Sequence, residues 1–116
     1  MAWTVLEHPL FADERVGLST KVSDKLDEVL LALSVAGPNL GRPLVDTLHG
    51  SRHANMKEIR FSEAGGVWRF AFAFDRDRNA VVLVGGEKQG VSQQRFYRNF
   101  LHQADRRFDD WLESTD

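Results

Sequence analysis

The stretch that decides the fold is an unbroken run of apolar residues around one arginine, Val67-Trp68-Arg69-Phe70-Ala71-Phe72-Ala73-Phe74. Successive side chains of a β-strand point to opposite faces of the sheet. One face of this strand therefore carries four large aromatic rings, and the other carries small residues and Arg69. Because burying the rings removes a large apolar area from water, we expect the aromatic face to pack against helices. The opposite face is then expected to be a shallow, open surface.

Two further strands are predicted beside this one. Residues 56–61 and 80–88 are rich in apolar and β-branched residues, and short turn-forming segments separate all three strands. Short connections predict antiparallel hairpins, and residues 75–79 have the composition of a hairpin turn. If Ile59 and Phe61 face the core, Arg60 lies on the same face as Arg69. Lys57 then points toward the core near the start of its strand, or its side chain reaches solvent at the edge of that strand.

Helical periodicity appears on both sides of these strands. Apolar residues recur at helical spacing over residues 20–36, with Ser19 or Thr20 as the N-cap and Gly37-Pro38 as the stop signal. A second helix is predicted over residues 92–112, whose aromatic stripe we interpret as core. Residues 3–6 are interpreted as a first strand, and residues 13–15 as the opening of a short helix. Residues 38–55 form a long connection, and long connections are often functional.

These elements predict a single α+β domain over residues 1–116, in which an N-terminal strand and helices precede a small antiparallel sheet and a C-terminal helix. The chain has no cysteine, so disulfides and cysteine-based zinc sites are excluded. It has no run of 18 to 20 apolar residues, as a membrane span requires, and no signal-peptide pattern. We therefore expect a cytoplasmic protein that does not act in a membrane.

The net charge of −2 argues against nucleic-acid binding through bulk charge alone. The charge is unevenly distributed, however. Residues 88–107 carry five basic side chains and one acidic one, whereas residues 108–116 are acidic. A solvated surface with scattered charges is the simpler interpretation of this pattern.

Several short motifs contain residue types found in metal or phosphate sites. His49 and His53 have a metal-ligand spacing, but they lie in a loop without a nearby carboxylate in the pattern. Asp75, Asp77 and Asn79 resemble the start of a calcium loop, but the glycine and the glutamate that such a loop needs are absent. Residues 85–88 lack the spacing of a phosphate-binding loop, so the two glycines are expected to mark a bulge or a close backbone approach. We expect neither a metal nor a cofactor.

Arg60, Arg69 and Lys88 are the candidate residues for an anion site on one sheet face. Guanidinium groups that converge in this way suit phosphate, because each offers a fixed fork of donors. The alternative is that Arg60 pairs with Glu58 or Glu63 and that Arg69 is merely solvated. Tyr97 lies off the aromatic stripe of the last helix, so its hydroxyl either reaches this site or belongs to a packing residue. The pattern leaves both alternatives open.

The segments 37–46, 48–52 and 55–60 contain the runs GPNLGRPLVD, LHGSR and NMKEIR, which are followed by the arginine-bearing strand and by AVVLVGGEK at residues 80–88. This combination resembles the HigB-type, phage-derived branch of the RelE/ParE toxin superfamily over residues 22–112. The resemblance implies a RelE-like fold and a toxin of a type II toxin–antitoxin system. It further implies a metal-independent endoribonuclease that cleaves translated messenger RNA at the ribosome.

Carried over by position, the resemblance gives each candidate residue a role. Arg60 and Arg69 would hold phosphate, Lys88 would act as cation or acid, and Tyr97 would serve as base or as a stacking platform. A further group would contact the RNA backbone, namely Arg52, Lys57, Arg95 and Arg98.

The sequence leaves two other functions open. One is a ParE-like toxin that inhibits gyrase by binding the protein, and the other is a catalytically inactive paralogue. All three predict a cognate antitoxin as partner, bound on the open sheet face and on exposed parts of helix 20–36. The resemblance also allows a homodimer, or a heterotetramer with the antitoxin.

Overall fold

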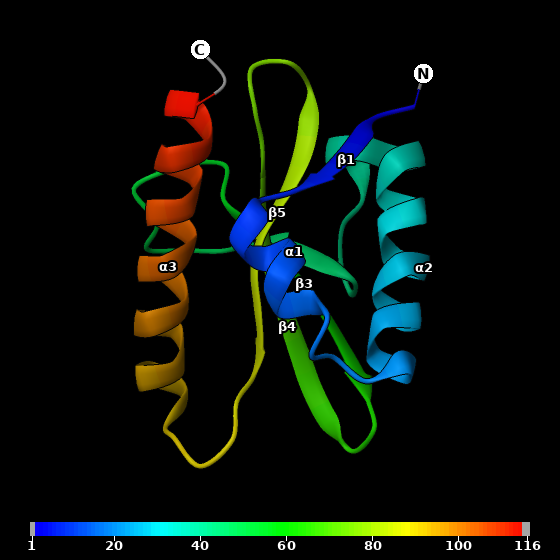
Figure 1. Ribbon diagram of the computed structural model, residues 1–116, viewed down its shortest axis with the longest axis vertical. Helices are drawn as coiled ribbons and strands as arrows, with labels where there is room; N and C mark the ends of the chain where they lie inside the picture. The colour runs from blue at the N-terminus through cyan, green and yellow to red at the C-terminus, as the bar shows by residue number, and fades with distance from the viewer. Residues whose placement is uncertain (1, 115–116) are drawn as a thin grey trace.

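The computed structural model describes residues 2–114 as a three-layer α/β/α arrangement. The elements follow in the order β1 (Thr4–Glu7), α1 (Pro9–Arg15), α2 (Thr20–Ala36), the 3-10 helix η1 (Gly37–Asn39), β2 (Val45–Thr47), β3 (Lys57–Glu63), β4 (Gly66–Phe74), β5 (Asn79–Glu87) and α3 (Gln93–Ser114). The sheet has the order β1-β5-β4-β3-β2. Figure 1 shows α2 on one side of the sheet, α3 on the other, and α1 beside β5. The expected α+β class is confirmed.

Helix α2 forms as the sequence predicts. The Ser19 hydroxyl accepts a hydrogen bond from the backbone N–H of Val22 at 3.2 Å, which satisfies one of the free donors at the helix start. The helix buries one apolar stripe against the sheet, which includes Leu26 and Leu33. Gly37 ends it with a positive φ of 59°. A side chain there would also clash with Trp3, because a Cβ at Gly37 would lie 2.2 Å from the indole nitrogen.

The prediction for the short first helix was wrong in position. Residues 13–15 end α1 rather than open it, and the helix begins at Pro9. His8 is its N-cap, with a ring nitrogen that accepts a hydrogen bond from the Leu10 N–H at 3.1 Å. Histidine is not among the usual N-cap residues, so the capping pattern did not reveal this start.

The structure adds one strand that was not predicted and extends another. The connection 38–55 contains β2, which pairs antiparallel with β3 but is only three residues long and so shows no periodicity. Strand β3 does not end at Phe61 but continues to Glu63, where Ala64 and Gly65 turn the chain with positive φ angles of 55° and 81°. The polar residues at positions 62 and 63 therefore extend the strand into an exposed hairpin. β1 adds a parallel pairing with β5 to the otherwise antiparallel sheet.

The aromatic face of β4 packs as expected, but the opposite face is not open. Phe70 and Phe72 are fully buried in the cluster that includes α2. Ala71 and Ala73, on the other face, are 0% and 1% exposed, in a second cluster formed with α3. The expectation of an open sheet face is wrong because the small alanines leave room for a helix to approach closely. The aromatic stripe of α3 is core, as predicted.

The glycines near the end of β5 serve close packing. The register between β4 and β5 shifts at Ala71/Phe72, so a bulge lies just before Gly85. A Cβ at Gly85 would lie 2.3 Å from the ring of Phe70, which is fully buried and cannot retreat. The sequence prediction that the two glycines mark a bulge or a close approach of another backbone is wrong in detail, because the bulge lies before them at Leu83 and the close groups are side chains.

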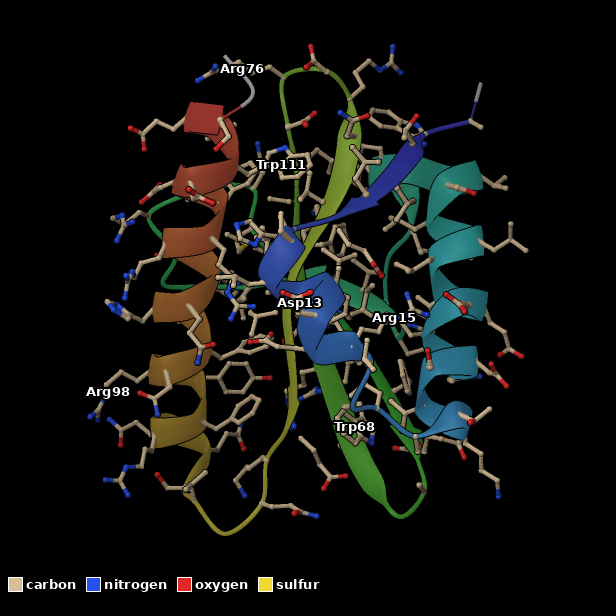
Figure 2. All side chains as sticks on the ribbon, in the orientation of Figure 1. Asp13, Arg15, Trp68, Arg76, Arg98 and Trp111 are labelled. Atoms are coloured by element: carbon tan, nitrogen blue, oxygen red, sulfur yellow. The ribbon has the colours of Figure 1, made fainter. Side chains whose placement is uncertain are left out.

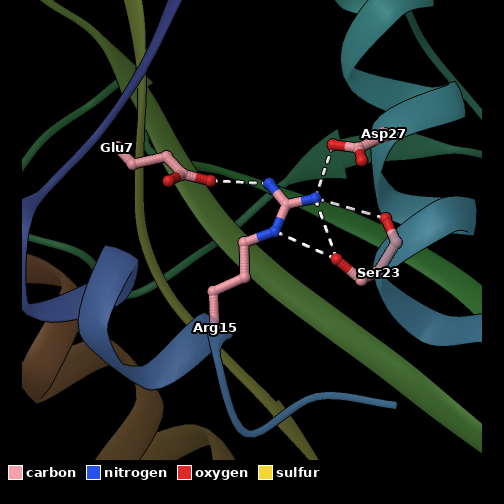
Figure 3. Close-up of polar contacts among 4 residues, drawn as sticks. All are labelled: Glu7, Arg15, Ser23 and Asp27. Atoms are coloured by element: carbon pink, nitrogen blue, oxygen red, sulfur yellow. Dashed lines mark hydrogen bonds and ion pairs between the residues drawn. The ribbon is translucent and has the colours of Figure 1, made fainter. Parts of the chain in front are cut away.

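Arg15 ties three elements together (Figure 3). Its guanidinium donates to Glu7 of β1 at 2.6 Å, and to both Asp27 at 2.5 Å and the Ser23 hydroxyl at 3.1 Å on α2. This cluster fixes α1 between β1 and α2. Within residues 2–114, no helix is both long and apolar enough to cross a membrane.

Candidate functional site

The site is built around a buried arginine in the central strand. Arg69 lies on the α3 face of β4 and is only 6% exposed. It is paired across the sheet with Arg60 of β3 on one side and with Gly86 of β5 on the other. Its Nε donates a hydrogen bond to the hydroxyl of Tyr97 on α3 at 2.8 Å. The interpretation of Arg69 as a merely solvated residue is therefore wrong.

Tyr97 links the arginine to a buried carboxylate. Its hydroxyl donates to Oε1 of Glu58 on β3 at 2.8 Å, and Glu58 is 8% exposed. Burial raises the pKa of the Tyr97 hydroxyl, the hydrogen bond to Glu58 raises it further, and Arg69 partly offsets both effects. At neutral pH the hydroxyl therefore stays protonated. The three side chains form one line of hydrogen bonds from guanidinium to carboxylate.

The first turns of α3 cover the arginine with aromatic rings. The guanidinium carbon of Arg69 lies 5.4 Å from the ring centre of Phe96 and 5.5 Å from that of Tyr97. Both distances are within the range of cation–π attraction. The rings lower the cost of taking the charge out of water, and they fix the orientation of the guanidinium fork.

Arg60 supplies an accessible charge beside this buried one. It is exposed and directly opposite Arg69. Within residues 2–114, its side chain makes no hydrogen bond or ion pair, so the predicted alternative of a pair with Glu58 or Glu63 is not observed. The two arginines share one sheet face, as predicted.

Glu58 and Phe96 are the members of the site that the sequence did not single out as functional, and Phe96 was interpreted as core. The alternation that places Arg60 beside Arg69 also places Glu58 on the same face, opposite Ala71. Strand alternation alone could therefore have predicted the place of Glu58 in the site. However, an acidic residue two positions from an arginine is more readily interpreted as the ion-pair partner of that arginine. The structure assigns Glu58 to Tyr97 instead.

The remaining predicted residues lie around or away from this cluster. Lys88 is exposed and directly follows β5, two residues after the pairing partner of Arg69. Lys57 pairs with Phe72 and therefore belongs to the α2 face of the sheet. Arg52 forms an ion pair with Asp109, roughly 18 Å along α3 from Tyr97 at 1.5 Å per residue. Arg95 and Arg98 are exposed on α3, and Figure 2 shows Arg98 pointing away from the sheet.

Two motifs rejected as metal sites have structural roles. His53 bonds to Asp109 at 2.8 Å, and Asp75 accepts hydrogen bonds from the backbone of Asp77 and Asn79 in the predicted hairpin turn. In the part of the chain that the structure describes, no three potential ligands are grouped as a metal site would need. The candidate site therefore consists of Glu58, Arg60, Arg69, Phe96 and Tyr97, with Lys88 at its margin.

Comparison with known proteins gives the family. Residues 13–109 match the family described as phage-derived protein Gp49-like. The chain belongs to this family. The match includes every residue of the candidate site, both the strands that carry the arginines and the first turns of α3.

Two relatives from Mycobacterium tuberculosis are provisionally designated toxins. HigB3 is 46% identical over 82 residues, which cover 71% of this chain and 69% of the relative. HigB2 is 40% identical over 97 residues, which cover 83% of this chain and 48% of the relative, so the chain spans about half of HigB2. Because HigB3 is 46% identical and is covered to 69% of its length, this Gp49-like chain groups with the HigB toxins, as the HigB-type resemblance in the sequence indicated.

A solved structure shares the fold. A double arginine-to-alanine mutant of the E. coli toxin RelE in the free state superposes with a TM-score of 0.66, covering 92% of this chain and 98% of that one. The identity is 15%, so this likeness concerns the fold alone.

Proposed function

We propose that this Gp49-like chain is a metal-independent endoribonuclease that cleaves messenger RNA during translation in the cytoplasm. One observation carries the proposal, namely the hydrogen-bonded line Arg69–Tyr97–Glu58 beside the exposed and unpaired Arg60. Phosphodiester cleavage by a neighbouring 2′-hydroxyl needs a proton acceptor, cations for the developing phosphorane charge, and a donor for the leaving oxygen. The cluster and its margin contain one group suited to each task.

Proton transfer follows from the bonding of Tyr97. Its raised pKa makes a phenolate base unfavourable at neutral pH. Instead, the tyrosine oxygen takes the proton of the attacking 2′-hydroxyl while the tyrosine proton passes to Glu58. The 2′-oxygen bonds to phosphorus, the bond from phosphorus to the 5′-oxygen breaks, and the products are a 2′,3′-cyclic phosphate and a 5′-hydroxyl. Lys88 is the nearest predicted donor for the leaving oxygen.

The two arginines divide the work on the phosphate. Arg60 is exposed and has no ion-pair partner within residues 2–114, so it is available to contact a non-bridging oxygen directly. Arg69 is buried and held by Tyr97, so it contributes fixed positive charge close behind the reacting groups. Arg95 and Arg98 are assigned to the RNA backbone outside the cluster. Lys57 lies on the α2 face of the sheet and Arg52 is paired with Asp109, so neither is assigned to this contact.

The cognate antitoxin that the toxin–antitoxin family implies would hold this activity in check. Growth after induction without the antitoxin, combined with primer extension on a reporter messenger RNA, tests the proposal. We expect wild type to arrest growth and to leave defined cuts. Arg60→Ala, Tyr97→Phe and Glu58→Gln should reduce cleavage by about 100-fold or more, the usual contribution of a positioned acid or base.

Lys21→Ala is the control, because Lys21 is an exposed cation on α2, which covers the other face of the sheet. It should cleave as wild type does. Growth arrest without cuts would favour the protein-binding, gyrase-directed alternative. Absence of both effects, in a folded protein, would identify an inactive relative.

A further inference from the structure

A cavity of about 350 Å³ lies between α1, the end of β5 and the first turns of α3, and we call it the β5 cavity. It does not continue along the two helices, because the ion pair of Glu14 on α1 with Arg107 on α3 bridges them at 2.6 Å. At that point Leu83 is buried, and its carbonyl already accepts a hydrogen bond from Arg107 at 2.8 Å. The β5 cavity therefore suits a compact ligand rather than an extended chain.

Aromatic rings line the β5 cavity. Phe11 and Phe70 contribute one pair of rings, with centres 5.9 Å apart, and Phe96 and Phe100 contribute another, with centres 5.2 Å apart. Gly85 adds no side chain that would fill the space, and a Cβ there would lie 3.4 Å from the ring of Phe11. Aromatic rings are the surfaces against which proteins seat the unstacked bases of single-stranded RNA. The apolar part of the cavity is thus suited to a planar, aromatic ligand.

Two side-chain amides stand on the α3 wall of the β5 cavity. Asn99 and Gln103 are exposed and lie four residues apart, so they share one face of the helix. Within residues 2–114, neither side chain makes a hydrogen bond. The charged groups that line the cavity are engaged elsewhere, because Glu14 binds Arg107 and Arg15 binds carboxylates of β1 and α2. An amide offers a donor beside an acceptor, which matches the edge of a nucleobase.

The β5 cavity adjoins the candidate site. Gly86, which lines it, is the strand partner of Arg69, and the ring centre of Phe96 lies 5.4 Å from the Arg69 guanidinium carbon. Arg60 on β3 is two strand spacings from Gly86, or about 10 Å. Lys88, the proposed donor to the leaving 5′-oxygen, is exposed and follows Gly86 by two residues. An RNA whose phosphate contacts Arg60 and whose 5′-oxygen faces Lys88 can therefore place the base of the downstream nucleotide in the cavity.

We propose that the β5 cavity binds the nucleobase on the 3′ side of the cleaved bond, and that Asn99 and Gln103 read the edge of that base. The proposal rests on the proposed ribonuclease function. Lys88 and Arg95, which make no ion pair within residues 2–114, supply positive charge beside the cavity for the flanking phosphates. Seating the downstream base in the cavity also unstacks it from the upstream base, which lets the 2′-oxygen align with the leaving 5′-oxygen.

Removing single bases from an RNA ligand tests the proposal. A short single-stranded RNA, 2′-O-methylated throughout so that it cannot be cleaved, carries one abasic residue at each position in turn, and fluorescence anisotropy measures its affinity. Wild type should lose about 10-fold in affinity at the position whose base occupies the cavity. Asn99→Trp fills the cavity, so it should bind the intact RNA about 10-fold more weakly and be insensitive to the abasic residue at that position. His102→Trp places the same bulk on an exposed position of α3 outside the cavity and should behave as wild type.

The positions of the cuts in cells give a second readout. Primer extension should show a base preference immediately 3′ of the wild-type cuts, and the double substitution Asn99→Ala with Gln103→Ala should weaken that preference while growth arrest persists. Equal abasic profiles of wild type and Asn99→Trp, or an unchanged preference in the double variant, would overturn the proposal and leave the ribonuclease function standing. Weaker antitoxin binding by Asn99→Trp with unaltered RNA binding would also overturn it, because the cavity would then belong to the antitoxin interface. A wild-type protein that neither binds nor cuts RNA would remove the ribonuclease function, and this proposal with it.

Discussion

Removing the hydroxyl of Tyr97 should destabilise the protein far more than removal of a surface hydroxyl would. Tyr97→Phe deletes the hydrogen bond to Glu58 and the one from Arg69, each 2.8 Å long. Hydrogen bonds to charged groups contribute about 1.5–3 kcal/mol each, and both partners are buried. We therefore expect the free energy of unfolding to fall by about 2–4 kcal/mol. At roughly 4 °C per kcal/mol for a domain of this size, the melting temperature would fall by roughly 8–16 °C.

Urea denaturation followed by tryptophan fluorescence measures this loss, as a lower midpoint with an unchanged slope. Ser34→Ala is the control, since it removes a hydroxyl that bonds only within the exposed surface of α2. It should stay within about 0.5 kcal/mol of wild type. A loss below about 0.5 kcal/mol for Tyr97→Phe would refute the assignment of its hydroxyl to the buried pair.

A double-mutant cycle sharpens the same test. In Tyr97→Phe the carboxylate of Glu58 stays buried without this donor, so adding Glu58→Gln should cost less than it does in wild type. Additive effects of the two substitutions would mean that the residues do not act together.

Two further predictions concern titration and RNA binding. Tyr97 is the only tyrosine of the chain, so tyrosinate absorbance reports on it alone. Its pKa should lie above the ordinary value of about 10. Glu58→Gln should lower this pKa, and Arg69→Met should raise it further. The pKa of Tyr97 is higher in the folded than in the unfolded protein, so the stability linked to its protonation is fully present below about pH 10 and is lost as the pH rises through the folded-state pKa. Urea midpoints should therefore fall more steeply at alkaline pH in wild type than in Tyr97→Phe. For a non-cleavable single-stranded RNA, replacing both Arg95 and Arg98 by glutamine should reduce the slope of log K against log salt by about 1.4, at about 0.7 per lost phosphate contact. Lys21→Gln on α2 should leave that slope unchanged, and an unaltered slope in the arginine variant would exclude this face of α3 from the RNA interface.

The fold was predictable wherever periodicity extends over several turns or a full strand. Helix 20–36 carries its apolar stripe, its serine cap and its glycine stop within the sequence itself. β2 was not predictable, because three residues carry no period. The covered alanine face was misjudged for a different reason. Small residues at Ala71 and Ala73 suggest little apolar area to bury, but that smallness lets α3 come close and bury its own rings.

The site was predictable in part. Alternation along β3 and β4 places Arg60 and Arg69 on one face, and the structure confirms that geometry. The contact of Tyr97 with Arg69 joins residues 28 positions apart on different elements, so the position of Tyr97 off the aromatic stripe left it as one of two alternatives and only the family resemblance favoured it. Glu58 was missed because local pattern favours pairing between neighbours in sequence, whereas its partner comes from α3. The roles of all these residues in catalysis stay predictions until the variants are measured.

The net charge is a poor guide to RNA binding by this protein, because the carboxylates near the end of α3 are already paired. Asp105 accepts hydrogen bonds from the Ser51 hydroxyl and the Arg52 backbone, Asp109 binds Arg52 and His53, and Asp110 binds His8. These carboxylates are engaged in contacts that anchor the second half of the helix to the loop after β2 and to the start of α1. The anchoring fixes the helix along its axis, which keeps the rings of its first turns above Arg69. The negative charge at one end of α3 thus positions the basic cluster at the other, and the exposed cations of Arg60, Lys88, Arg95 and Arg98 stay without ion-pair partners within residues 2–114.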